Sequence, residues 1–153
     1  MIQFKNVSKV FHGQTIIDDI SFVIEDGEFV VLLGESGCGK TTTLKMINKL
    51  ISPSSGTVEI NGQDIGDADP IALRRRMGYV IQQIGLFPHM TVRENIEIIA
   101  KMNNKDKGRL EQNARRLMEM VNLDPDQFLD AYPSEMSGGQ QQRAGVVRAF
   151  MTD

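Results

Sequence analysis

Short apolar runs separated by turn residues fill the first quarter of the chain, and this pattern predicts strands. Apolar and polar residues alternate in part over Ile2–Val10 and over Ile16–Glu25, and Phe11-His12-Gly13-Gln14 forms a turn between them. A third run, Glu28–Leu33, follows Asp26-Gly27. Alternation with a period of two is typical of half-buried strands. We therefore expect an antiparallel β flap followed by a buried strand.

The next part of the chain mixes helical and strand patterns. Pro, Gly, Ser and Asn mark its loops, because these residues adopt turn conformations readily. The expected elements are a helix over 40–50, a loop over 52–56, a strand over 57–60 that ends in a tight turn at Asn61-Gly62, a short helix over 71–76 and a second buried strand over 77–81.

From Thr91 onward the apolar residues recur with helical spacing. Thr91 and Glu94 have the spacing of a capping box, which predicts a helix start. Apolar residues three and four positions apart share one helix face. Two such faces need to pack on each other; they consist of Ile96, Ile99 and Ala100 in the first helix and Leu110, Ala114, Leu117, Met118 and Val121 in the second.

Composition narrows the class of protein. With 153 residues and 41% hydrophobic residues, the chain can build one sizeable core. A net charge of −3 and a sequence pI near 5.4 do not favour nucleic acid as the main partner, because duplex binding normally requires a basic face. The apolar runs are far shorter than the ~20 residues that cross a bilayer, and no signal peptide is recognisable. The single cysteine, Cys38, fits a reducing compartment, so we expect a cytoplasmic protein.

Residues 34–41 read GESGCGKT, the phosphate-loop pattern G-x-x-x-x-G-K-[ST]. Glycines let the backbone curl with its N–H groups pointing inward, and Lys40 is placed to reach the β- and γ-phosphates of a nucleotide. Thr41 offers a hydroxyl to a bound Mg²⁺. A glycine-rich turn in an ordinary strand-helix unit is the alternative. The candidate nucleotide-binding residues are Gly34, Glu35, Ser36, Gly37, Cys38, Gly39, Lys40, Thr41 and Thr42.

A second motif, Ser137-Gly138-Gly139-Gln140, precedes a helical stretch that runs to Phe150. Ser137 is a suitable N-cap, and the two glycines leave the N–H groups of the first turn uncovered. The start of this helix is therefore a candidate second anion site. Taken alone, the motif also fits a flexible linker or a plain helix cap.

The two motifs together resemble the ABC-type ATPases, in which SGGQ is the core of the signature motif. This chain has Met136 where the family usually has leucine. The resemblance implies an α/β fold, with a P-loop NTPase core of the ABC ATPase type, an N-terminal antiparallel β flap and an inserted α-helical subdomain. It divides the chain into 1–82, 83–136 and 137–153. It also implies that ATP and Mg²⁺ bind in a head-to-tail dimer of two copies, between one copy's phosphate loop and the other's signature helix.

Further roles follow from the resemblance. Lys40 and Gln82 are the implied catalytic residues, and Thr41 and Gln82 are the implied metal ligands. Gln83 competes for the role of Gln82, but the family's spacing to Leu86-Phe87-Pro88 selects Gln82. Phe11 resembles the aromatic residue that stacks on adenine, and its alternative is a core residue at a strand end. We interpret His12 and His89 as loop histidines.

The stretch over 82–94, QQIGLFPHMTVRE, is similar to ATPase subunits of bacterial importers for quaternary amines such as glycine betaine, carnitine and choline. This implies a protein at the inner face of the cell membrane that contacts an integral membrane permease and hydrolyses ATP when intact. ABC proteins of translation or DNA repair and phosphate-loop kinases fit less well. The nine methionines favour core filling over an adaptable contact with a membrane partner.

The resemblance covers only the first two thirds of the family's ATPase domain, and no apolar run ending in Asp-Glu occurs here. That run would supply a magnesium ligand and a residue that positions water. We therefore expect the C-terminal part of the core to be missing and this chain to bind nucleotide weakly and hydrolyse it negligibly. The alternative function is that of a nucleotide-binding module without turnover. An apolar sheet edge left unpaired would also favour self-association.

Overall fold

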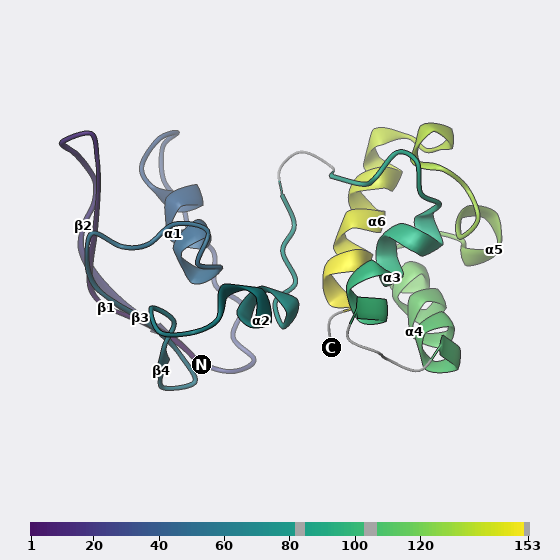
Figure 1. Cartoon of the computed structure of the whole chain (residues 1–153). Helices are drawn as coiled ribbons and strands as arrows, with labels where there is room; N and C mark the ends of the chain where they lie inside the picture. Colours follow the sequence, from purple (N-terminus) through teal and green to yellow (C-terminus); the bar gives the residue numbers. More distant parts are fainter. Residues whose placement is uncertain (82–84, 103–106, 152–153) are drawn as a thin grey trace. The chain divides into compact units, whose positions relative to one another are not determined.

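A computed structural model describes residues 1–81, 85–102 and 107–151 of the chain. The chain forms two compact units, Met1–Arg74 and Arg75–Asp153, which Figure 1 shows as a strand-rich part and a helical part. The division into 1–82, 83–136 and 137–153 concerns functional subdomains and stays a prediction. None of the helices in the described ranges is long and apolar enough to span a membrane.

The first unit contains an antiparallel sheet of four strands in the order β2-β1-β3-β4. Its long hairpin, the predicted β flap, consists of β1 (Ile2–Phe11) and β2 (Gln14–Ile24). His12 and Gly13 both have positive φ angles, as a tight two-residue turn requires. The remaining strands are β3 (Ser55–Ile60) and β4 (Gln63–Asp64).

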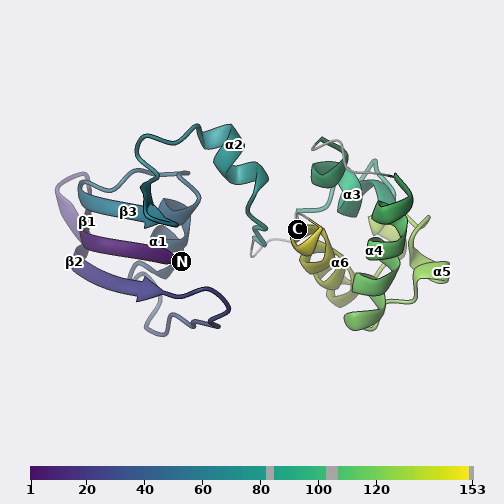
Figure 2. The ribbon, with the colours of Figure 1, turned by 90° about the horizontal axis from the view of Figure 1, so that it is seen from below.

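Helix α1 (Lys40–Ile47) packs on one face of this sheet, as Figure 2 shows. Met46 of the helix is fully buried against Phe4 and Val58 of the sheet. The helix ends before the expected Leu50, because Lys49 adopts a left-handed conformation and Arg74 of α2 (Pro70–Arg75) donates to the Asn48 carbonyl at 3.0 Å. These contacts fix the C-terminal end of α1, and Met46 holds the helix against the sheet.

Two expected strands do not form. Residues 28–33 and 77–81 are not in strands, and their apolar side chains are largely exposed, with Phe29 at 92% and Leu33 at 87%. The prediction of buried strands at both places is wrong for this structure. An apolar run becomes a strand only beside a pairing partner, and among the described residues neither run has one.

The second unit is a helical cluster around one apolar core. The predicted capping box at Thr91 and Glu94 is confirmed, since Thr91 N–H donates to Glu94 Oε2 at 2.8 Å and Glu94 N–H donates to Thr91 Oγ1 at 3.3 Å. Ile96 and Ala100 pack with Leu110 and Met118 in this core, so the expected pairing of two helix faces is confirmed except for Ile99, which is only half-buried and lies outside the core cluster. The helices are α3 (Val92–Met102), α4 (Lys107–Met120), α5 (Pro125–Phe128), the 3₁₀ turn η1 (Pro133–Glu135) and α6 (Gly138–Phe150).

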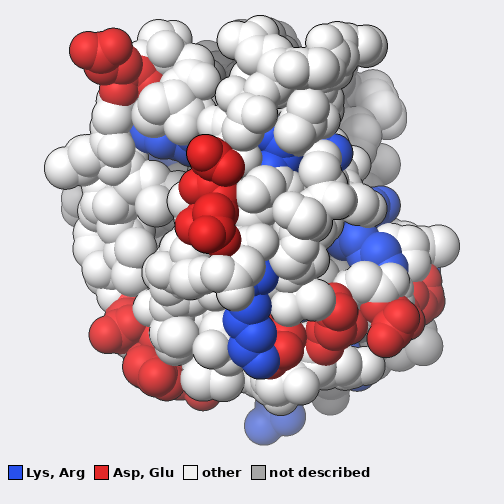
Figure 3. Space-filling view, turned by 90° about the vertical axis from the view of Figure 1, so that its left-hand side faces the viewer, with Lys and Arg blue, Asp and Glu red and all other residues white. Residues whose placement is uncertain are grey.

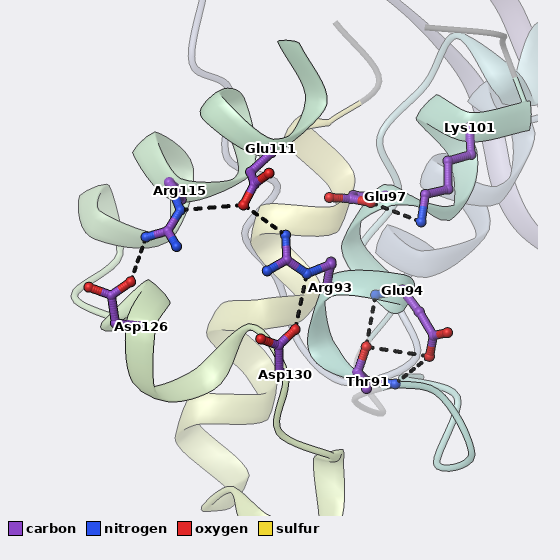
Figure 4. A network of polar contacts seen from close by, with 9 residues as sticks. All are labelled: Thr91, Arg93, Glu94, Glu97, Lys101, Glu111, Arg115, Asp126 and Asp130. Atoms are coloured by element: carbon purple, nitrogen blue, oxygen red, sulfur yellow. Dashed lines mark hydrogen bonds and ion pairs between the residues drawn. The ribbon is translucent and has the colours of Figure 1, made fainter. Parts of the chain in front are cut away.

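A polar network crosses the surface of this helical unit (Figure 4). Arg93 of α3 binds Asp130 at 3.1 Å and Glu111 at 3.2 Å, and Arg115 binds Asp126 at 2.7 Å. The hydrogen bond that Arg93 donates to Asp130 is the main cause that raises the pKa of Arg93 above its ordinary value. The network ties α3 to α4 and to the segment after α5.

The methionines divide between core and surface. Met46, Met118, Met136 and Met151 are buried, whereas Met102 and Met120 are more than half exposed. Core filling therefore accounts for part of the methionine content. On the face of the molecule in Figure 3, acidic and basic side chains are interspersed with uncharged surface, which matches the small net charge of −3.

Candidate functional site

The phosphate-loop segment forms a glycine-dependent turn in the first unit. Gly34, Gly37 and Gly39 have φ angles of 152°, 90° and 97°, which side-chain-bearing residues rarely adopt. Gly39 caps α1 without a side-chain hydrogen bond, and a Cβ at this position would lie 3.0 Å from Ile17 Cγ1 of β2. The sequence therefore brings the loop backbone and the N-terminus of α1 close to the sheet.

Lys40 folds back over this loop. Its ammonium group donates to the carbonyl oxygens of Gly34 at 2.7 Å and Glu35 at 2.6 Å, and it lies 3.5 Å from Cys38 Sγ. These partners carry no formal negative charge. Among the ion pairs of the described residues, none includes Lys40. A half-buried cation with only neutral partners on an exposed loop is suited to an incoming anion.

A hollow of about 280 Å³ adjoins this loop. Thr43 lies at its base, where its buried hydroxyl donates to the Gly39 carbonyl at 3.1 Å and fixes the first turn of α1. The hollow therefore combines a cation and a helix N-terminus with walls that are largely apolar but include the carboxylate of Asp18. Its lining residues are Ile16, Ile17, Asp18, Ile20, Leu32, Leu33, Cys38, Gly39, Lys40 and Thr43.

The remaining loop residues fit a nucleotide better than a metal held by protein ligands alone. Glu35, Ser36 and Cys38 are exposed, Thr41 is exposed on the first turn of α1, and Thr42 is half-buried. The described ranges contain no cluster of three or more His, Cys, Asp or Glu residues that could hold a metal ion. A Mg²⁺ ion here would therefore depend on Thr41 together with oxygen atoms of a bound phosphate chain.

Phe11 lies at the end of β1 and is 39% exposed rather than enclosed in the core. In the view of Figure 1, the hairpin turn after Phe11 and the loop before α1 lie toward the same end of the first unit. The ring is therefore accessible to a ligand.

The second motif begins α6 in the helical unit. Ser137 caps this helix as expected: its hydroxyl accepts from Gln140 N–H at 3.3 Å, and its own N–H donates to Gln140 Oε1 at 2.7 Å. A Cβ at Gly138 or Gly139 would meet no atom within 4 Å, so the space above the first turn is open. Met136, which precedes the motif, is buried and anchors it in the core.

The phosphate-loop residues lie close together in the first unit. Ser137–Gln140 belong to the second unit. Gln82 and its competitor Gln83 lie outside the described residues. His12 occupies the hairpin turn, and the ring of His89 packs edge-on against Phe87 with centroids 6.0 Å apart. Lys9, whose ammonium group lies over the Phe11 ring, and the buried Asn95 were not identified from the sequence, because isolated polar residues give no pattern.

The chain is similar to known ATP-binding proteins over its whole length. The chain is 55% identical to the osmoprotectant import ATP-binding protein OsmV of Salmonella typhimurium and 49% identical to the glycine betaine/carnitine/choline transport ATP-binding protein OpuCA of Bacillus subtilis, in each case over 100% of its own length. It spans 41% and 40% of the length of these two relatives.

Solved structures agree with the sequence comparisons. A dimeric ATP-binding cassette in a post-hydrolysis state, bound to ADP and Pi, superimposes with a TM-score of 0.87 at 32% identity and is covered over 70% of its length. This likeness confirms the expected fold class, an ABC-type ATPase core with an antiparallel β part and a helical part. The ABC transporter family profile matches residues 17–153. The chain therefore belongs to the ABC transporter family.

Proposed function

We propose that this chain forms the ATP-binding part of the energy-coupling subunit of an importer for quaternary amines or related osmoprotectants. The observation that carries the proposal is the environment of Lys40, whose partners within the described part of the chain are neutral carbonyl and thiol groups of a glycine loop at a helix N-terminus. The import role rests on the names of relatives at 55% and 49% identity.

In this proposal different residues of the loop bind different parts of the Mg²⁺-triphosphate. Lys40 exchanges the Gly34 and Glu35 carbonyls for β- and γ-phosphate oxygens, and the N–H groups at the start of α1 bind the same phosphates. Thr41 contributes its hydroxyl to Mg²⁺, which supplies charge compensation when bound. Gln82 completes the metal site and orients the attacking water, and Phe11 stacks on the adenine ring.

The presence of two anion-binding motifs in one chain suggests that the partner is a second copy of the same chain. The open first turn of α6 at Gly138 and Gly139 is suited to the nucleotide held by a second copy of the chain. The dimeric ATP-binding cassettes among the similar structures support this arrangement. The complete subunit would then bind a membrane-embedded permease on the inner face of the cell membrane and convert ATP hydrolysis into transport.

Titration of the chain with Mg²⁺-ATP, monitored by calorimetry, tests the nucleotide site. Lys40→Ala should weaken binding by at least about tenfold, because a charge-assisted contact to phosphate contributes about 1.5–3 kcal/mol. Lys45→Ala is the matched control, since Lys45 is an exposed lysine on the same helix. Equal affinities for the native chain and Lys40→Ala would overturn the assignment of the loop.

Uptake by cells that express the complete protein with its permease tests the transported class. Labelled glycine betaine should accumulate, whereas labelled spermidine should not. Spermidine is the informative control because a spermidine/putrescine import ATP-binding protein of Chromobacterium violaceum is 44% identical to this chain. Accumulation of spermidine alone would contradict the proposed class.

A further inference from the structure

The end of β1 is held in place by the loop that precedes β3. Val10 N–H donates to Ser54 Oγ at 3.0 Å, and Ser54 N–H donates to the Ser8 carbonyl at 2.8 Å. Lys9 donates to the Ser52 carbonyl at 2.6 Å. The strand end that carries Phe11 is therefore fixed on both sides of Lys9.

This anchoring places the Lys9 ammonium group over the Phe11 ring, with 4.8 Å between Lys9 Nζ and the ring centroid. The register of β1 against β2 shifts between Lys9 and Val10, so the contact follows from the local path of the strand end rather than from regular alternation of side chains. A cation within about 6 Å of an aromatic centroid is attracted to the negative face of the ring. One face of Phe11 is thus occupied by a cation that is itself held by a backbone carbonyl.

Phe11 is 39% exposed although Lys9 lies over its ring, so part of the side chain stays accessible to a ligand. A cation on one face withdraws electron density from the ring and makes the other face a better stacking surface for an electron-rich purine. The contact also holds the ring in one orientation before a ligand arrives, which lowers the entropic cost of stacking.

We infer that Lys9 is a positioning residue for nucleotide recognition: it orients and polarises Phe11 so that the free ring face selects a purine base. The inference rests on the proposed nucleotide-binding function. Lys9 acts through Phe11 and does not itself contact the base or the phosphates. Removing Lys9 should therefore lower the affinity for a nucleotide but leave the affinity for a bare phosphate chain unchanged.

Calorimetric titrations with Mg²⁺-ATP and with Mg²⁺-tripolyphosphate test the inference on the chain as it exists. Lys9→Met keeps the aliphatic stem and removes the charge, so ATP affinity should fall about two- to fivefold while tripolyphosphate affinity stays unchanged. Lys9→Arg, which keeps a cation able to contact the ring, should retain most of the ATP affinity. In a chain that also carries Phe11→Ala, the Lys9→Met change should have no further effect.

Two results would overturn the inference. If Lys9→Met weakens ATP and tripolyphosphate equally, Lys9 acts only as a general attractor of anions. If Lys9→Met lowers ATP affinity by the same factor in the native chain and in a chain that carries Phe11→Ala, the effect of Lys9 does not depend on the Phe11 ring. The Lys40→Ala titration separates these outcomes from failure of the nucleotide site itself, because Lys40→Ala should weaken both ligands.

Discussion

The side chain of Asn95 binds the backbone of Phe87 in both directions: Asn95 Oδ1 accepts from Phe87 N–H at 2.7 Å, and Asn95 Nδ2 donates to the Phe87 carbonyl at 3.1 Å. The same amide nitrogen reaches the carbonyls of Met90 at 3.1 Å and Thr91 at 2.9 Å. Asn95 is fully buried, so one side chain closes the loop before α3.

Replacing Asn95 by alanine should destabilise the chain by about 1–3 kcal/mol, because the Phe87 N–H loses its acceptor and the carbonyls of Phe87 and Thr91 keep only their backbone donors. The free energy of unfolding in urea measures the effect. Gln112→Ala, on an exposed position of α4, is the control and should change stability by less than about 0.5 kcal/mol. Equal losses in both variants would show that the Asn95 contacts do not hold the loop.

Alanine substitutions at Gly56 and Gly62 distinguish the cost of backbone strain from the cost of a steric clash. Both have nearly the same positive φ angle, 76° and 77°, but a Cβ at Gly56 would lie 2.1 Å from the Asn6 carbonyl oxygen, whereas one at Gly62 meets nothing within 4 Å. Gly62→Ala should cost about 1–2 kcal/mol from strain alone. Gly56→Ala should cost about 1–3 kcal/mol more, because the β1–β3 pairing has to shift. Similar urea midpoints for the two variants would contradict the close approach of these strands.

Cys38 offers a chemical test of the phosphate-loop assignment. The thiol is exposed, and a Cβ at Gly34 would lie only 2.6 Å from Cys38 Sγ, so the loop has little room for added bulk. Alkylation with iodoacetamide should abolish ATP binding in a calorimetric titration. Cys38→Ser should bind ATP normally and resist the reagent. Unchanged ATP affinity after complete alkylation would place the nucleotide elsewhere.

The ion pairs of Arg93 should give a salt-dependent contribution to stability. Arg93 is 27% exposed and reaches both Glu111 and Asp130, so Arg93→Met should cost about 1 kcal/mol at low salt. Raising the salt from about 0.1 M to about 1 M shortens the screening length from about 10 Å to about 3 Å and should reduce that cost.

Arg116→Met is the matched control for Arg93→Met. Arg116 lies on α4, and its hydrogen bonds within the described residues go to Asn113 and Met120 rather than to a carboxylate. Unfolding curves at the two salt concentrations should therefore shift little for this variant. A cost for Arg93→Met that does not change with salt would assign the effect to lost packing.

The helices α3, α4 and α6 were predictable because their causes are local, whereas the short elements α5 and η1 were not predicted. Thr91 with Glu94 and Ser137 with Gln140 form their capping boxes over four consecutive residues, and the apolar faces of α3 and α4 follow from spacing alone. The predicted strands over 28–33 and 77–81 failed because a strand depends on a neighbour that no local pattern specifies.

The phosphate-loop motif, the signature motif and the family could be recognised from the chain alone, since each depends on residue types at fixed spacing. How distant side chains meet became visible only in the folded chain. Lys9 lies over Phe11 and donates to the Ser52 carbonyl, Lys40 folds onto the loop carbonyls, and Asn95 closes the loop at Phe87. Such contacts depend on burial and on the path of the backbone, which a chain acquires only when its elements pack.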